Sequence, residues 1–347
     1  MTSDPVARYL AGRGARLAKR ERLRAMTTGE TLDMALRVYR NLGWTFLRLT
    51  VVPSLFCLGG IAFVLFYVLP SLFVTHHGAD VNGQLAETAV AVSLALVVGG
   101  PLFLIGLAYI SAVVIHMTSD YMLGKPIRPE QATKIAAGAV PALLRVSVRE
   151  LALSASGILA ALGIMGLGAV ISQYTPSDSP LGGLVVLLGG CGLAAGAIIF
   201  LYVVSLHGLA PAVAVLENAN GKEASKRSTW LMKAQWGHVS GVNALFNAFG
   251  LMLFAGIIEW AGFAALFAAL DVGQHIEDLV SGSSVAGLME ATVGLIPPFL
   301  VIWTVLPVWA ASVTIVYYER RIRLEGYDIE ALAEEIGTSG RTSRFDV

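Results

Sequence analysis

The sequence has few charged residues. Only 14% of its 347 residues are Asp, Glu, Lys or Arg, whereas an average soluble domain has about 25%. Apolar residues, counting Tyr and Cys, make up 56% of the chain. A water-soluble domain could not cover so much apolar surface with so few charges. The composition therefore excludes an ordinary soluble protein and indicates a membrane protein.

Cysteines and catalytic motifs are also scarce. The only two cysteines, Cys57 and Cys191, lie inside apolar runs, which argues against a disulfide framework or a cysteine-rich metal site. The chain lacks the patterns Gly-x-x-x-x-Gly-Lys-Ser/Thr, Gly-x-Ser-x-Gly and Gly-x-Gly-x-x-Gly, which bind phosphates, expose a nucleophilic serine and bind dinucleotides respectively. We therefore expect no catalytic residue, no cofactor and no metal site, and a protein that is not an enzyme.

Long apolar runs dominate what is present. A helix of about 20 apolar residues is enough to cross the hydrocarbon core of a bilayer. The sequence contains six such runs, at about 46–75, 88–117, 151–173, 181–215, 241–270 and 289–318. The first run is too long for the core of a cleavable signal peptide, so we expect it to remain as an anchor.

The positions of the basic residues predict the orientation of these spans. All 24 Lys and Arg residues precede or begin the first run, lie between runs two and three or four and five, or follow the sixth. The loops 76–87, 174–180 and 271–288 contain none. The positive-inside rule then places both termini in the cytoplasm and favours a multi-pass protein of a bacterial cytoplasmic membrane. The net charge of zero gives no reason to expect a nucleic-acid partner.

Three stretches of similar length indicate an internal repeat. Gly29, Gly124, Gly221 and Gly326 are separated by 95, 97 and 105 residues, and an acid, namely Asp120, Glu217 or Glu319, lies where each even-numbered run ends. We interpret the chain as three units, each an amphipathic cytoplasmic helix followed by a transmembrane hairpin. The alternative is that any three hairpins with basic inner loops look alike.

The predicted fold class is thus all-α: a polytopic membrane protein with six transmembrane helices arranged as three hairpins, each preceded by an amphipathic interfacial helix. The domain organisation follows from the repeat. We expect a basic cytoplasmic tail at 1–27, a transmembrane domain at 28–335 with units at about 29–123, 124–220 and 221–325, and a flexible cytoplasmic tail at 336–347.

Basic and tryptophan side chains interleave just before the fifth run. Such a mixture is typical of a helix that lies at the level of the lipid headgroups. It predicts contact with anionic lipid at the cytoplasmic face, although generic anchoring beside the bilayer explains the pattern as well. A membrane or cytoplasmic protein is a further possible class of partner. The candidate lipid-interface residues are Lys222, Lys226, Arg227, Trp230, Lys233 and Trp236.

Prolines interrupt two of the runs at comparable depth. Pro101 lies in the second run, and Pro297 and Pro298 lie in the sixth. Broken helices at matching positions of a repeat are typical of transporter binding sites, whereas a plain kink is the simpler explanation. Glu259, the clearest acid within a run, is the fourth candidate residue of such a site. Its distance from Gly241 predicts a position near the outer boundary of the bilayer, and an ion or proton site within the membrane is the alternative.

Two segments resemble a known family. Leu209–Glu217 with the following Ser225–Leu231, and Tyr317–Glu330, resemble bacterial six-span proteins related to the membrane domain of glycerophosphoryl diester phosphodiesterases. Thr28–Asp33 and Leu123–Gly124 also fit, so the resemblance covers about residues 28–335. It implies a helical membrane module. Some relatives carry a soluble phosphodiesterase domain that is missing here, so the resemblance transfers neither that activity nor any catalytic residue.

These observations favour a non-enzymatic function. The repeat, the basic interfacial helices and the missing catalytic motifs predict a scaffold or a lipid-associated accessory module. The alternative is a small-molecule or ion transporter or channel, with a site among the proline-broken spans two and six. An enzyme that uses Asp120, Glu217 or Glu319 at the inner face is the third hypothesis.

Overall fold

The computed structural model describes residues 23–63, 90–174, 181–233 and 295–329. These residues contain helices and no strand, which confirms the all-helical prediction for this part of the chain. The elements are α2 (Thr28–Phe63), the π-helical turn η2 (Ala95–Gly99), α5 (Gly100–Met122), α6 (Pro129–Tyr174), α7 (Leu181–His207), α8 (Ala210–Leu216), α9 (Gly221–Lys233) and α13 (Ile296–Glu325).

Five helical stretches are long and apolar enough to cross a membrane. They are Gly29–Phe63, Val90–Met122, Pro129–Gly168, Gly183–Leu216 and Ile296–Glu325. Each overlaps one of the predicted runs, which supports the assignment as a helical membrane protein. The fifth predicted run, 241–270, lies outside the described residues, as do residues 1–22 of the expected tail 1–27 and all of the expected tail 336–347.

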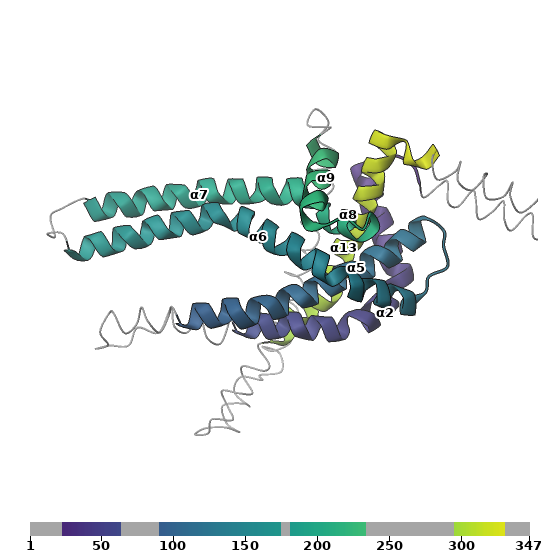
Figure 1. Cartoon of the computed structure of the whole chain (residues 1–347), viewed down its shortest axis with the longest axis horizontal. Helices are drawn as coiled ribbons and strands as arrows, with labels where there is room; N and C mark the ends of the chain where they lie inside the picture. The colour runs from purple at the N-terminus through teal and green to yellow at the C-terminus, as the bar shows by residue number, and fades with distance from the viewer. Residues whose placement is uncertain (1–22, 64–89, 175–180, 234–294, 330–347) are drawn as a thin grey trace, which may run out of the picture.

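The amphipathic segments before the first two hairpins are not separate helices. α2 has 36 residues and α6 has 46, and each joins the predicted amphipathic segment to the following span without a break. Extending an existing helix costs less than starting a new one, because nucleation is the unfavourable step. Both helices change direction along their length instead of ending (Figure 1). The predicted boundary between interfacial helix and span is therefore a bend in α2 and α6.

Helices α6 and α7 form an antiparallel hairpin that extends away from the other helices (Figure 1). Glycines hold the two backbones together. A Cβ atom added at Gly196 would lie 2.9 Å from the carbonyl carbon of Gly157 and 2.9 Å from the nitrogen of Ile158. Many other side chains of the hairpin, such as Leu187 and Ile198, are exposed. Small residues at the contact and apolar residues outside are typical of helices packed within lipid.

The packed core lies at the opposite end of this hairpin from the end of α6 and the start of α7 (Figure 1). There α5 packs against α2, α8 and α13. The fully buried side chains of this core include Phe46, Ile115, Leu209 and Ile315. The end of each of the three helices α5, α8 and α13 is followed by a left-handed residue, Gly124, Asn218 or Gly326. Two of these residues, Asn218 and Gly326, directly follow polar residues described next, Glu217 and Glu325.

Candidate functional site

A tight corner between α8 and α9 fixes the position of Glu217. This residue is the C-terminal cap of α8, and the next residue, Asn218, has φ 53°, a conformation that Asn adopts more readily than most residues. Asn220 then caps α9, because its side-chain oxygen accepts hydrogen bonds from the backbone N–H groups of Lys222 and Glu223, both at 3.2 Å. Glu217 is thereby held beside the start of α9.

Ser228 links the buried side of α9 to the junction of α7 and α8 through two hydrogen bonds. Its hydroxyl donates to the carbonyl of Leu206 at 2.8 Å and accepts from the N–H of Leu209 at 3.2 Å. The Ser228 side chain is completely buried, so both hydrogen bonds are shielded from water. The rotation of α9 about its axis is consequently fixed, which decides which of its side chains point outward.

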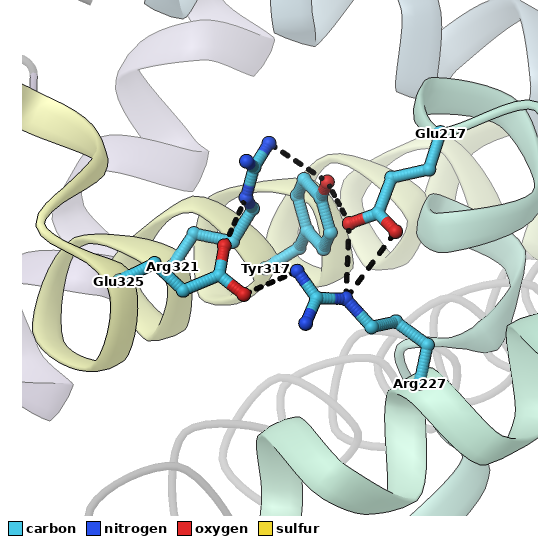
Figure 2. Close-up of polar contacts among 5 residues, drawn as sticks. All are labelled: Glu217, Arg227, Tyr317, Arg321 and Glu325. Carbon is cyan, nitrogen blue, oxygen red and sulfur yellow. Dashed lines mark hydrogen bonds and ion pairs between the residues drawn. The ribbon is translucent and has the colours of Figure 1, made fainter. Parts of the chain in front are cut away.

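Glu217 is the centre of a polar network that joins three helices (Figure 2). Its carboxylate accepts a hydrogen bond from the Tyr317 hydroxyl of α13 at 2.8 Å. The Nε of Arg227, from α9, lies 3.3 Å from each of the two Glu217 carboxylate oxygens. A carboxylate at the end of α8 therefore contacts both α9 and α13.

The network closes into a ring through the end of α13. The Nη2 group of Arg227 donates a hydrogen bond to the carboxylate of Glu325. Arg321 donates from Nε to Glu325 at 2.8 Å and from Nη1 to the Tyr317 hydroxyl at 3.3 Å. We call these five residues, Glu217, Arg227, Tyr317, Arg321 and Glu325, the polar ring (Figure 2).

The polar ring balances charge among side chains that are mostly shielded from solvent. It contains two carboxylates and two guanidinium groups, and the side chains of Glu325 and Arg321 are only 19% and 20% exposed. Charge-assisted hydrogen bonds are stronger than neutral ones, and an uncompensated charge is costly beside an apolar core. Both carboxylates accept bonds from an arginine and from a second donor. This arrangement is therefore best suited to hold the helices α8, α9 and α13 together.

Aromatic side chains extend the ring toward α5. The Arg321 guanidinium lies 4.1 Å from the centre of the Tyr327 ring, a favourable cation–π geometry. Tyr327 in turn contacts Tyr318, with ring centres 5.7 Å apart, and the Tyr318 hydroxyl is 2.6 Å from the Ser119 hydroxyl of α5. The start of the turn after α13 is thus connected to α5 as well as to α8 and α9.

A second charged cluster on α13 anchors the chain that precedes α2. Glu319 is buried and forms ion pairs with Arg320, at 3.5 Å, and with Arg323. Arg323 also donates to the backbone carbonyl of Met26 at 2.8 Å. Glu30 then caps the start of α2 by accepting from the Thr27 N–H at 2.8 Å, as in a capping box. The C-terminal part of α13 therefore holds both α2 and α9.

The candidate lipid-interface residues do not all share one environment. Lys222, Lys226 and Trp230 are exposed and, with spacings of four residues, lie along one side of α9. Arg227 instead belongs to the polar ring, although its guanidinium also lies 5.0 Å from the centre of the Trp230 ring. Lys233 is the last residue of α9, and its side chain is not described. Trp236 and Glu259 lie outside the described residues.

The prolines occupy the starts of two helices. Pro101 is in the first turn of α5, directly after η2, and the residues Gly99 and Gly100 keep helical dihedral angles. The second span is therefore distorted by a π-helical turn and is not broken there. Pro297 and Pro298 are in the first turn of α13, where the missing N–H of proline has no cost.

The sequence did not identify Tyr317, Arg321 and Glu325 as one group, although they belong to the segment that carries the family resemblance. A signal was available, since the three residues are spaced by four and must lie on the same side of a helix. The link to Glu217 and Arg227 had no such signal, because it joins positions about 100 residues apart and depends on how α13 packs.

The chain matches no protein-family model, no curated protein and no solved structure. The resemblance to the membrane domain of glycerophosphoryl diester phosphodiesterases therefore stays a prediction. Within the described ranges, no three His, Cys, Asp or Glu side chains lie together as metal ligands. The function must accordingly be argued from the helices and the polar ring themselves.

Proposed function

We propose that the chain is a six-span protein of a bacterial cytoplasmic membrane that acts as a non-enzymatic scaffold or lipid-associated module. Its three units are repeats of a helix and a hairpin, and the end that contains the polar ring faces the cytoplasm. A residue with a left-handed backbone conformation follows each of α5, α8 and α13, namely Gly124, Asn218 or Gly326, and this recurrence supports the repeat. The one-sided distribution of basic residues supports the orientation.

The observation that carries this proposal is the polar ring. Glu217, the acid at the end of the fourth span, is already engaged by Arg227 and Tyr317, and Glu319, the acid at the end of the sixth, by two arginines. Groups that are engaged in this way, by charge-assisted hydrogen bonds, stabilise helix contacts. The exposed Lys222, Lys226 and Trp230 on α9 then remain as the surface that meets the membrane.

Removing the two exposed lysines of α9 tests the lipid association. For the double variant Lys222→Gln, Lys226→Gln we expect stabilisation by phosphatidylglycerol, relative to phosphatidylcholine, to fall by about 1–2 kcal/mol, because each basic side chain near an anionic surface contributes about 1 kcal/mol. Thermal unfolding in detergent with either lipid added measures this difference.

The matched control is Lys125→Gln, Lys134→Gln, which removes the same charge from exposed positions before and on α6. These lysines have no exposed tryptophan beside them in the sequence, so we expect a smaller loss of stabilisation by phosphatidylglycerol than for the α9 variant. Equal losses in the two double variants would show that α9 is not a lipid-binding surface, only one part of a basic face.

Transport is the second candidate, and η2 is the observation that favours it. A π-helical turn inside a helix is often found at a functional site, and this one lies directly before Pro101 in the second span. Ligand-dependent stabilisation that disappears in the variants Pro101→Ala and Pro297→Ala would support a binding site there. Stabilisation that survives both substitutions would remove this candidate.

A further inference from the structure

One side of α2 presents basic and aromatic side chains that no contact described so far explains. Arg37, Arg40, Trp44 and Arg48 follow one another at intervals of three or four residues, and all four are exposed. This spacing places them on the same side of an α-helix. Trp44 is 65% exposed, and the Arg48 guanidinium lies 4.9 Å from the centre of its ring.

The same side of α2 continues into apolar surface. Val52, Leu55 and Phe56, which follow Arg48 by one to two turns, are 59%, 52% and 46% exposed. Along this side the helix therefore changes from three guanidinium groups, with the Trp44 indole among them, to apolar side chains. A tryptophan within one or two turns of such a transition is typical of the boundary between headgroups and hydrocarbon.

No acidic side chain among the described residues neutralises Arg37 and Arg40 of this surface. Arg227 on α9 is bound by Glu217 and Glu325. In contrast, neither Arg37 nor Arg40 has an ion-pair partner in the part of the chain that the structure describes. The surface therefore offers three guanidinium groups within about three turns of helix, which favours an anionic ligand with several phosphate or ester oxygens.

We propose that this side of α2 is a binding site for one anionic phospholipid. The phosphate lies among Arg40, Trp44 and Arg48, and the acyl chains lie along Val52, Leu55 and Phe56. An anionic phospholipid is complementary to this side of α2, because its negatively charged headgroup can contact the arginines while its hydrocarbon chains contact the apolar side chains. A soluble anion would use the arginines only. The proposal rests on the membrane orientation under the proposed function, but it concerns a different helix from α9.

Brominated lipids test this site, because bromine quenches only nearby tryptophans. The protein is reconstituted in phosphatidylcholine vesicles with a small fraction of brominated phosphatidylglycerol or brominated phosphatidylcholine. The signal of Trp44 is the difference between the parent and the variant Trp44→Phe. We expect about fivefold stronger apparent binding of phosphatidylglycerol at Trp44, the factor that corresponds to about 1 kcal/mol for one basic group.

The triple variant Arg37→Gln, Arg40→Gln, Arg48→Gln should abolish this preference, whereas Lys222→Gln, Lys226→Gln on α9 should retain it. All five positions are exposed, so unchanged thermal unfolding in detergent verifies that the variants fold. Equal quenching by both lipids in the parent, or a preference that survives the triple variant, would overturn the proposal. Neither result affects lipid stabilisation through α9, so failure here is distinguishable from failure of the proposed function.

Discussion

Replacing Gly106 with alanine is expected to destabilise the protein by about 1–3 kcal/mol, the usual cost of an overpacked core. The added Cβ would lie 2.5 Å from the carbonyl oxygen of Pro53 and 2.6 Å from the sulfur of Cys57. The first contact is with backbone, so a change of side-chain rotamer cannot relieve it. The helices α2 and α5 must move apart, and the midpoint of unfolding in denaturing detergent measures the effect.

The matched control for this prediction is Gly138→Ala on α6. No described atom outside its own helix segment lies within 4 Å of a Cβ built at Gly138. Because alanine is the better helix former, this variant should be more stable by about 0.5–1 kcal/mol. If Gly106→Ala unfolded at the same midpoint as the parent, the close packing of α2 against α5 described above would be wrong.

Arg227→Met is expected to cost about 2–3 kcal/mol, because it removes the cation that Glu217 and Glu325 share. Removing one partner of a buried ion pair lowers the free energy of unfolding by about 3–5 kcal/mol. We expect a smaller loss here because the Arg227 side chain is 30% exposed. Methionine keeps the apolar contact with the helix surface. Unfolding in a denaturant series gives the change in free energy.

Lys226→Met is the control, because it removes a neighbouring positive charge that is exposed on α9, and it should change stability by less than about 0.5 kcal/mol. A double-mutant cycle of Arg227→Met with Glu325→Gln should give a coupling energy of about 1 kcal/mol or more. A coupling of zero would show that the polar ring does not hold α9 against α13.

The sequence predicted well what depends on local composition. The apolar runs around 100, 160, 200 and 305 each overlap a described helix, because the length and the apolar composition of a run are local properties that indicate whether a helix can span the bilayer. The boundary between amphipathic helix and span was wrong for α2 and α6, which continue through it. A change in polarity does not interrupt backbone hydrogen bonding, so it gives no reliable signal for a helix end.

The polar ring could be predicted only in part. The spacing of Tyr317, Arg321 and Glu325 was visible, but the role of Glu217 depends on the left-handed turn at Asn218 and on the packing of α13. Arg227 looked like a lipid-facing residue because it is adjacent to Lys226. The rotation of α9 is decided by the buried Ser228 and its two hydrogen bonds, a tertiary contact that no pattern within α9 contains.

Cysteine accessibility in intact cells tests most directly the claim that the polar ring and α9 face the cytoplasm. Single cysteines are introduced as Ser177→Cys, in the loop 174–180, and as Lys222→Cys, on α9, after Cys57 and Cys191 are replaced. A membrane-impermeant maleimide should label Ser177→Cys in intact cells and Lys222→Cys only after permeabilisation. Labelling of Lys222→Cys in intact cells, with Ser177→Cys protected, would contradict the proposed orientation and with it the lipid-binding roles of α2 and α9.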